Sequence, residues 1–446
     1  MEAWWALLLF VTVTGVLMAG FPVAFTLGGV SLWFALIGFL TGWFDADFIA
    51  ALPNRLNGIL NNVTLMAVPA FVFMGVVLEK AKLAESLLQN MAALLGSKKG
   101  GLGFALLIVG MLLAASTGIV GATVVTLGLL AMPVMQKHGY DTSLAAGTIC
   151  ASGTLGQIIP PSIVLVLLGD VLSNAYQQAQ LNLQIFNPKT VSVQDLFMGA
   201  LIPGLMLVGL YALYLFWVKW RRPEAMPAIH SEQPKLSKIL KSLFPPLFLI
   251  LAVLGSIISG KATPTEAASV GSIGALLLAA FNQQLNINMM RSALKETVKV
   301  TAMVFMILIG AALFSLVFKG FHGDEAVQHF LTHLPGGNGT ALILVMLVLF
   351  LLGFILDFIE ITFVVIPIVG PILLMMGYDP VWLGIMIAIN LQTSFLTPPF
   401  GFALFYLRGV ADINTRDLYR GGMPFILLQL LMLLLLFYFP QLVSVF

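Results

Sequence analysis

Charged residues are scarce in this chain. Only 9% of its 446 residues are charged, against about 25% in an average soluble protein, and 60% are hydrophobic. Its 21 basic and 19 acidic residues nearly balance, which argues against nucleic-acid binding, and the single Cys150 excludes a disulfide framework. With a mean hydropathy of +1.03, the composition predicts a protein that crosses the lipid bilayer many times.

A series of apolar runs is long enough to cross a bilayer as helices, which takes roughly 17 to 25 residues. They lie near residues 4–20, 22–43, 64–80, 196–218, 242–259, 264–281, 300–318 and 422–440. Because lysine and arginine favour the cytoplasmic side, their positions predict that both chain termini lie outside. The same rule places the proline-containing segment 219–241 in the cytoplasm, as a linker between two halves.

Two other apolar segments, 142–173 and 380–408, are interrupted by polar residues and a Pro-Pro pair. Proline removes a backbone donor and clashes with the preceding turn, so we expect helix to stop before Pro160 and Pro398 and to restart on them. Unwound backbone within a membrane is tolerated only where protein buries it or where it lines a wet cavity. The two breaks therefore predict a binding site.

The stretches 101–136 and 339–376 are divided near their middles, at Ser116 to Gly118 and at Asp357 to Glu360. Their arms are too short to span, so we predict helical hairpins that enter the membrane and return. Amphipathic stretches at 84–96 and 324–336 precede the hairpins. They are predicted to be either arms lying along the membrane surface or short connecting helices.

The two halves of the chain are related by a shift of 238 residues. The shift brings Gly139-Tyr140-Asp141 onto Gly377-Tyr378-Asp379 and the first Pro-Pro pair onto the second. Five predicted crossings separate Tyr140 from Tyr378, and an odd number turns the second copy upside down. Inverted repeats with broken helices meeting at mid-membrane are typical of secondary transporters.

The residues around the breaks resemble those of a known family. Residues 151–162 (ASGTLGQIIPPS) and 390–401 (NLQTSFLTPPFG) look like the paired segments of the large membrane subunit of tripartite ATP-independent periplasmic (TRAP) transporters. The resemblance covers nearly the whole length. It implies an all-α polytopic membrane protein of the bacterial inner membrane, with an inverted repeat, two re-entrant hairpins and two broken helices, that works by an elevator movement.

The same resemblance implies a function and two partners. The function is sodium-driven import of organic acids, with sodium ions as the coupling cofactor. The partners are a small four-span membrane subunit and a soluble periplasmic substrate-binding protein, both separate polypeptides. A self-sufficient sodium–anion symporter remains an alternative, as does a membrane scaffold or receptor that transports nothing. We find no arrangement of nucleophile, base and orienting group, so an enzyme is not expected.

Repeat and resemblance together predict a division into frame and transport unit. Residues 1–100 are predicted to form frame helices and an arm, and residues 101–175 the first hairpin and broken helix. Residues 176–320 would form further frame helices with the linker, and residues 321–410 the second arm, hairpin and broken helix. Residues 411–446 would form a terminal span. The hairpins and broken helices would form the moving unit.

Sodium takes oxygen ligands, which unwound backbone and hydroxyl or amide side chains supply. We expect them from Ser152, Gly153, Thr154, Asp357, Glu360, Asn390 and Gln392. A carboxylate substrate would meet the helix N-termini at the breaks, where backbone N–H groups favour anions. The residues expected there are Ser116, Thr117, Gly156, Pro160, Thr393, Ser394, Thr397 and Pro398, with Thr397 able to cap the second helix.

Two alternatives to ligand binding stay open. The serine and threonine hydroxyls can instead bond to carbonyls of their own helices. Asp357 and Glu360 have the spacing of a capping pattern at a helix start, in which each side chain accepts a backbone N–H of the other end of the turn. An acidic group inside a membrane costs about 2.5 to 3.5 kcal/mol, which favours a functional role in addition.

Overall fold

The computed structural model describes residues 2–185, 187–228 and 236–443, and every regular element in these ranges is a helix. Two compact units divide the chain. Unit 1 contains Met1–Met66, Leu167–Ser192 and Lys299–Leu383; unit 2 contains Ala67–Val166, Val193–Val298 and Gly384–Phe446. The predicted fold class, all-α and polytopic, is confirmed.

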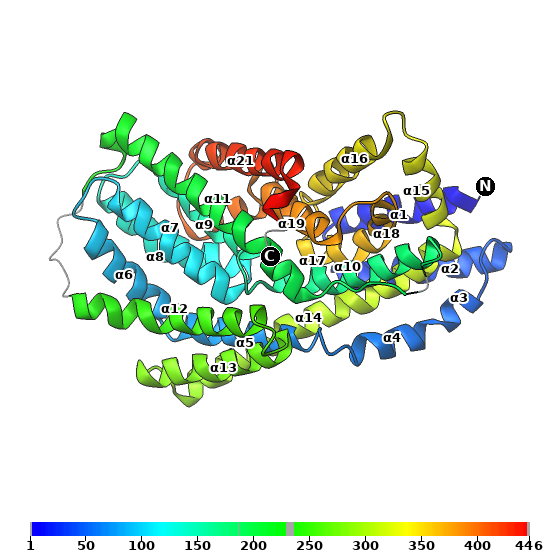
Figure 1. Ribbon diagram of the computed structural model, residues 1–446, viewed down its shortest axis with the longest axis horizontal. Helices are drawn as coiled ribbons and strands as arrows, with labels where there is room; N and C mark the ends of the chain where they lie inside the picture. Colours follow the sequence, from blue (N-terminus) through cyan, green and yellow to red (C-terminus); the bar gives the residue numbers. More distant parts are fainter. Residues whose placement is uncertain (1, 186, 229–235, 444–446) are drawn as a thin grey trace. The chain divides into compact units, whose positions relative to one another are not determined.

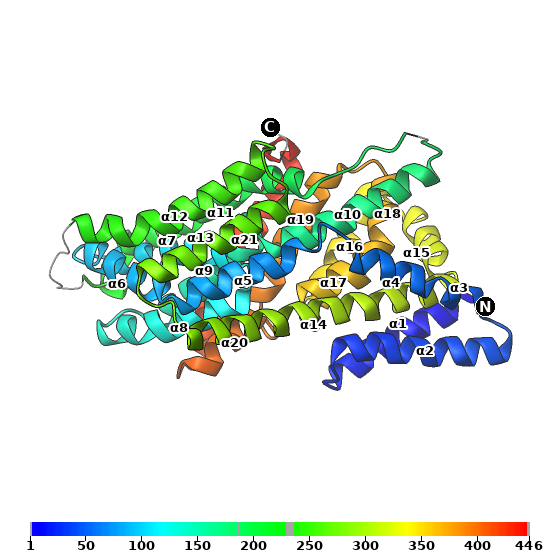
Figure 2. The ribbon, with the colours of Figure 1, turned by 90° about the horizontal axis from the view of Figure 1, so that it is seen from below.

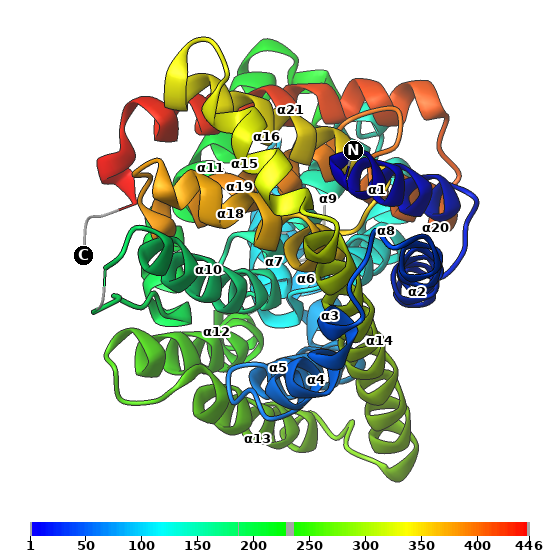
Figure 3. The same ribbon diagram turned by 90° about the vertical axis from the view of Figure 1, so that its right-hand side faces the viewer.

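Unit 1 holds the N-terminal helices and the second predicted hairpin. Its helices are α1 (Glu2–Met18), α2 (Val23–Thr41), α3 (Asp47–Ala50), α4 (Leu52–Leu60), most of α10 (Ile163–Asn182), the C-terminal part of α14 (Ile287–Gly320), α15 (Gly323–Thr332), α16 (Gly337–Leu352), α17 (Phe358–Val364) and α18 (Ile366–Met375). Helices α1 and α2 lie side by side (Figure 2, Figure 3). The Trp5 ring stacks on Phe321 at 5.9 Å between centroids.

Unit 2 holds both helix breaks and the first predicted hairpin. Its elements are α5 (Ala67–Lys80), α6 (Leu83–Leu95), α7 (Gly101–Thr117), α8 (Val120–Lys137), α9 (Thr142–Thr154), η1 (Leu155–Gln157), the first turn of α10, α11 (Val193–Arg221), η2 (Pro223–Ala225), α12 (Leu236–Ile258), α13 (Pro264–Phe281), the N-terminal part of α14, most of α19 (Pro380–Leu396), α20 (Phe402–Val410), α21 (Thr415–Tyr438) and η3 (Pro440–Leu442). Helix α13 packs along both α5 and α12 (Figure 1).

Six described helices are long and apolar enough to cross a membrane: α2, α8, α11, α13, α14 and α21. Helix α8 is an arm of the first predicted hairpin, so the expectation that this arm is too short to span was wrong, because the helix continues to Lys137 and reaches 18 residues. Helices α17 and α18 form a seventh candidate, bent by 59° as a broken span or re-entrant loop. Helix α5 starts only at Ala67 and has 14 residues, so the run predicted from residue 64 is shorter as a helix than the usual span of about 17. The chain is a multi-pass membrane protein.

The repeat register is visible in the helix boundaries. Helices α8 and α17 begin at Val120 and Phe358, and α9 and α19 begin at Thr142 and Pro380, each pair 238 residues apart. The same side chain precedes both helices of the second pair. Asp141 Oδ1 accepts the Leu144 N–H at 2.9 Å, and Asp379 Oδ1 accepts the Trp382 N–H at 2.8 Å.

The predicted arms are helices α6 and α15, each preceded by a residue in the left-handed region, Lys82 (φ 55°) and His322 (φ 53°). Whether they lie along the membrane surface stays a prediction. Of the predicted linker 219–241, residues 229–235 lie outside the described ranges. Its beginning is tied to the first hairpin, because the N–H groups of Gly100 and Asp141 donate to the carbonyls of Met226 and Ala225 at 2.9 and 3.0 Å.

Helices α9 and α21 of unit 2 cross in backbone contact, and glycine makes that approach possible. A Cβ on Gly147 would overlap the Gly421 carbonyl, and a Cβ on Gly421 would overlap the Ser143 carbonyl. Small residues at such crossings let backbones touch inside a membrane, where packing replaces the hydrophobic effect as the driving force. Helix α21 therefore holds the first broken helix in place.

Candidate functional site

Both predicted helix breaks are present. Helix α9 passes through the short 3₁₀ turn η1 and ends, and α10 begins at Ile163; α19 ends at Leu396, and α20 begins at Phe402. The Pro160–Pro161 and Pro398–Pro399 peptide bonds are both cis. The prediction that helix restarts on Pro160 and Pro398 was wrong, because a residue that precedes proline is sterically disfavoured from helical conformation, and here that residue is the first proline itself.

The first unwound segment lies against the tip of the first hairpin. Gly156 faces the end of α7 so closely that a Cβ there would stand 2.8 Å from the Ala114 carbonyl oxygen. Gly118, which separates α7 from α8, has φ +61° and would place a Cβ 3.1 to 3.3 Å from Ile163 at the start of α10. Glycine is needed at both positions, and the hairpin tip and the break form one packed region.

The two broken helices meet at equivalent positions. Gln392 Nε2 donates to Thr154 Oγ1 at 3.4 Å, and these residues are 238 apart, which is the repeat shift. Both side chains are completely buried. In a pair of copies related by a two-fold axis, equivalent residues touch only where the axis passes between them. For the predicted inverted repeat, the Thr154–Gln392 contact would therefore lie on the axis between the two copies.

Buried oxygens near this centre are available to a ligand. Ser152 Oγ and Gln392 Oε1 have no hydrogen-bond partner among the described residues, although both side chains are completely buried. Leaving a buried polar group unpaired costs about 1 to 3 kcal/mol, so such groups are expected to meet water or an ion. These two oxygens belong to the predicted sodium ligands.

The other predicted hydroxyls of unit 2 bond within their own helices. Hydroxyl groups of Ser116, Thr154, Thr393, Ser394 and Thr397 donate to the carbonyls of Leu113, Ala151, Ile389, Leu391 and Thr393 at 2.7 to 2.9 Å. This matches the structural alternative for serine and threonine. Each hydroxyl oxygen still keeps acceptor capacity, so a role toward sodium or substrate stays a prediction.

The remaining predicted residues of unit 2 differ in their surroundings. Gly153 packs against Val124 of α8, where a larger side chain would not fit. Asn390 is buried in α19, Pro160 is buried, and Pro398 is half-buried. Thr117 ends α7, and its side chain lies outside what the structure describes.

Thr397 does not cap the helix that follows it. Its hydroxyl points back into α19, and the N-cap of α20 is Gly401, which has no side chain to accept a hydrogen bond. The expectation of a Thr397 cap was wrong because the Pro-Pro turn delays the start of α20 by several residues. The Tyr419 hydroxyl of α21 instead donates to the Pro399 carbonyl at 3.0 Å and holds the turn.

Asp357 and Glu360 belong to unit 1 and form the predicted capping box of α17. The Asp357 N–H donates to Glu360 Oε2 at 3.0 Å, and Asp357 Oδ1 accepts the Phe358 N–H at 2.7 Å. The side chain of Asp357 also accepts the N–H three residues on. The capping role is confirmed, whereas a direct role toward a cation stays a prediction.

A second layer of buried polar groups was not expected from the sequence. Gln429 Nε2 of α21 donates to the Tyr211 hydroxyl of α11 at 2.7 Å, and this hydroxyl also lies within hydrogen-bonding reach of Gln392 and Thr154. Gln157 of η1 is completely buried too, and neither atom of its carboxamide has a partner in the described part of the chain. Through Tyr211 and Gln429, helices α11 and α21 are linked to the Thr154–Gln392 contact between α9 and α19.

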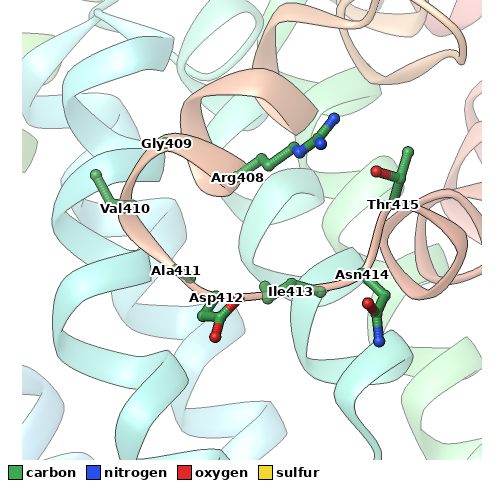
Figure 4. Close-up of a pocket in the computed structure, with 8 residues that line it drawn as sticks. All are labelled: Arg408, Gly409, Val410, Ala411, Asp412, Ile413, Asn414 and Thr415. Carbon is green, nitrogen blue, oxygen red and sulfur yellow. The ribbon is translucent and has the colours of Figure 1, made fainter.

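A hollow of about 480 Å³ lies elsewhere in unit 2, along the loop from Arg408 to Thr415 (Figure 4). The Arg408 side chain extends toward Thr415 at the start of α21, whereas Asp412 points away from it (Figure 4). Arg408 is exposed, as expected for an anchor at the end of a span. The hollow is open and formed by one loop.

The model of the family described as "Tripartite ATP-independent periplasmic transporter, DctM component" matches residues 10–442. The chain belongs to this family. The DctM-family chain is 32% identical to the sialic acid TRAP transporter large permease protein SiaM of Vibrio cholerae, over 96% of this chain and 95% of that one. It is 30% identical to the C4-dicarboxylate large permease protein DctM of the same organism, over 97% and 95%.

A third relative is the 2,3-diketo-L-gulonate TRAP transporter large permease protein YiaN of Escherichia coli, with 26% identity over 96% of each chain. Among solved structures, the YdaH transporter of Alcanivorax borkumensis matches with a TM-score of 0.65 and 18% identity, over 89% of this chain and 90% of that one. That likeness shows the fold alone. Because its relatives are permeases, this DctM-family chain is a transport protein and not an enzyme.

Proposed function

We propose that this DctM-family chain imports organic acids together with sodium ions by an elevator movement in the bacterial inner membrane. It would act with a small four-span membrane subunit and receive substrate from a periplasmic binding protein. The relatives named for C4-dicarboxylates, sialic acid and 2,3-diketo-L-gulonate support a carboxylate substrate. Its family and the length of the match support the tripartite assembly.

The observation that carries the sodium proposal is the Thr154–Gln392 contact between the broken helices. The C-terminal turns of α9 and α19, each of which precedes a break, come together there, and the buried acceptor oxygens of Ser152 and Gln392 stay unpaired within the described chain. Sodium is bound by oxygen atoms, and transporters hold it where helices are interrupted. The proposed ligands are Ser152, Gly153, Thr154, Asn390 and Gln392 of unit 2, with Asp357 and Glu360 of unit 1 as further candidates.

For the substrate, we propose backbone N–H groups and hydroxyls at the breaks. Helix N-termini favour carboxylates, and α10 and α20 each begin a few residues after a Pro-Pro pair. Gly156, Thr393, Ser394 and Thr397 lie in the sequence around these breaks, and Pro160 and Pro398 lie in the turns. Ser116 and Thr117 lie at the tip of the first hairpin, which packs against the first break.

Uptake into proteoliposomes tests the proposal. The chain and its small membrane partner are reconstituted, and labelled organic acids are offered with and without a sodium gradient and the cognate binding protein. Uptake that requires both supports the tripartite assembly. Uptake with sodium but without the binding protein favours a self-sufficient symporter, and failure with every acid of a broad panel would contradict an organic-acid substrate.

A further inference from the structure

A cavity of about 480 Å³ lies within unit 1 and is lined by residues of that unit. Helices α4, α10, α14, α17 and α18 form its wall. Its polar lining consists of Arg55, Asn62, Asp170, Asn174 and Ser315, and the rest is apolar. Phe363 and Pro367 contribute to the wall, so the cavity borders the second predicted hairpin.

Arg55 is a half-buried cation in this wall. Its guanidinium donates to Ser315 Oγ at 3.3 Å, and within the described ranges no carboxylate lies at ion-pairing distance from it. A guanidinium carries five N–H donors in a planar fork, so most of its donor capacity is left over. That fork fits a carboxylate through two parallel hydrogen bonds.

Asp170 supplies hydrogen-bond acceptors in the same cavity. Its Oδ1 accepts the Asn62 amide at 2.8 Å, and Asn62 is itself fixed because its Oδ1 accepts the N–H groups of Thr64 and Leu65 at 2.9 and 3.3 Å. An ionised carboxylate has about four acceptor sites, so Asp170 can still accept hydrogen bonds from a ligand. A second carboxylate beside it would be repelled.

We infer that this cavity binds hydroxylated monocarboxylates, with the ligand carboxylate on Arg55 and a ligand hydroxyl donating to Asp170. The inference rests on the proposed function, because a permease for organic acids meets such ligands, and it goes beyond it, because this cavity is a second site in addition to the one proposed at the helix breaks. Plain dicarboxylates satisfy Arg55 but place a negative group near Asp170. Aliphatic monocarboxylates satisfy Arg55 and leave Asp170 without a donor.

The test compares D-gluconate with hexanoate, two six-carbon monocarboxylates that differ in their hydroxyl groups, and adds adipate as the dicarboxylate. Binding is measured on the purified full-length chain in lipid nanodiscs. Asn174→Cys provides a reporter, because Asn174 is exposed at the cavity while the only native thiol, Cys150, is completely buried. Gluconate is expected to slow maleimide labelling of this cysteine at concentrations about tenfold or more below those needed for hexanoate or adipate.

Two variants separate the two contacts. Arg55→Gln should weaken protection by gluconate about tenfold to a hundredfold, because a charge-assisted pair is lost. Asp170→Asn keeps an acceptor for Asn62 but removes the charge, so gluconate should lose its advantage over hexanoate. The matched controls are Arg291→Gln and Asp412→Asn, exposed residues that do not line the cavity, and both should behave as the parent. Arg55→Lys, which keeps the charge, should bind between parent and Arg55→Gln and serves if Arg55→Gln does not fold.

Several outcomes overturn the inference. These are equal protection by gluconate and hexanoate, absence of protection by gluconate, unchanged binding in Arg55→Gln, or an unchanged preference in Asp170→Asn. Uptake in proteoliposomes keeps the two proposals apart. Sodium-driven uptake without any gluconate protection removes the cavity inference and leaves the proposed function, whereas gluconate protection without any uptake leaves the cavity and removes the proposed function.

Discussion

The Tyr211 hydroxyl joins Gln429 to the contact between the two broken helices. It accepts from Gln429 at 2.7 Å and reaches Gln392 and Thr154, while the ring packs edge-on against Phe425 at 5.1 Å. The contacts of its ring and of its hydroxyl together fix the orientation of the Tyr211 side chain. Ligand oxygens are kept in place by such outer contacts, whose loss weakens ion binding even though they do not touch the ion.

Removing the Tyr211 hydroxyl is therefore expected to weaken sodium binding. In Tyr211→Phe, the sodium concentration for half-maximal uptake should rise about two- to tenfold, because one net hydrogen bond is lost. The sodium dependence of uptake measures this. Tyr214→Phe is the matched control, since Tyr214 lies on the same helix and packs against Phe425 at the same distance of 5.1 Å. Equal shifts in both variants would contradict a positioning role.

Asp357→Asn distinguishes capping from cation binding in the second hairpin. Asparagine is as good an N-cap as aspartate, and the hydrogen bond from the residue 357 N–H to Glu360 is retained. We therefore expect the free energy of unfolding to change by less than about 0.5 kcal/mol. If the charge contributes to a cation site, the half-saturating sodium concentration rises. An unchanged sodium dependence would leave Asp357 with its cap alone.

A residue could be predicted where its pattern lies within a few consecutive positions, and could not where its partners come from distant parts of the sequence. The Asp357–Glu360 box is visible in four consecutive residues, and the structure confirms it. Tyr211 and Gln429 are 218 residues apart, and each looks like an ordinary polar residue in an apolar helix, so only the packing of α11 against α21 brings them together. The sequence did not predict Arg55 and Asp170 as site residues either, because only the fold brings α4 and α10 to one cavity.

At the scale of elements, the crossing of α9 and α21 depends on Gly421. In Gly421→Ala the new methyl group overlaps the Ser143 carbonyl, so the helices must separate. Overpacking of this kind costs about 1 to 3 kcal/mol, which should lower the thermal unfolding midpoint in detergent and the folded yield. Gly409→Ala is the control, because no atom lies within 4 Å of the position that its methyl group would occupy. Similar losses in both variants would remove this role of Gly421.

Helix starts were readable from the sequence, whereas helix restarts were not. Asp141 and Asp379 cap α9 and α19 through hydrogen bonds to the third residue on, as aspartate before a helix typically does. The Pro-Pro pairs stopped helices as expected. They did not restart them, because proline at a first helical position is permitted but not required, and the turn geometry of 158–162 and 397–401 is set by tertiary contacts such as Tyr419 with Pro399.

At the scale of the whole molecule, the elevator proposal requires the first hairpin to move relative to the frame. Thr126 of the hairpin lies at 3.5 Å from the Glu79 carboxylate of α5 through its hydroxyl. Glu79→Cys combined with Thr126→Cys, oxidised to a disulfide, should therefore reduce uptake by about tenfold or more, with recovery on reduction. Gel mobility after proteolysis between the cysteines reports crosslinking. Full uptake by the crosslinked protein would contradict the proposed movement.

The assignment of 1–100 and 176–320 as frame, and of 101–175 and 321–410 as moving unit, stays a prediction. The compact units of the structure are defined by packing in one conformation, whereas frame and moving unit are defined by what changes between conformations. Uptake measured on the crosslinked protein addresses that second definition directly.

The contact between Thr154 and Gln392 also bears on ancestry. If the two halves descend from one duplicated segment, the ancestor was a homodimer of antiparallel copies, and this position then touched its own copy. Such a dimer can hold only identical side chains there, whether two threonines or two glutamines. A threonine that accepts a hydrogen bond from a glutamine became possible only after gene duplication allowed the copies to differ, so this contact records a division of labour between once-equal halves.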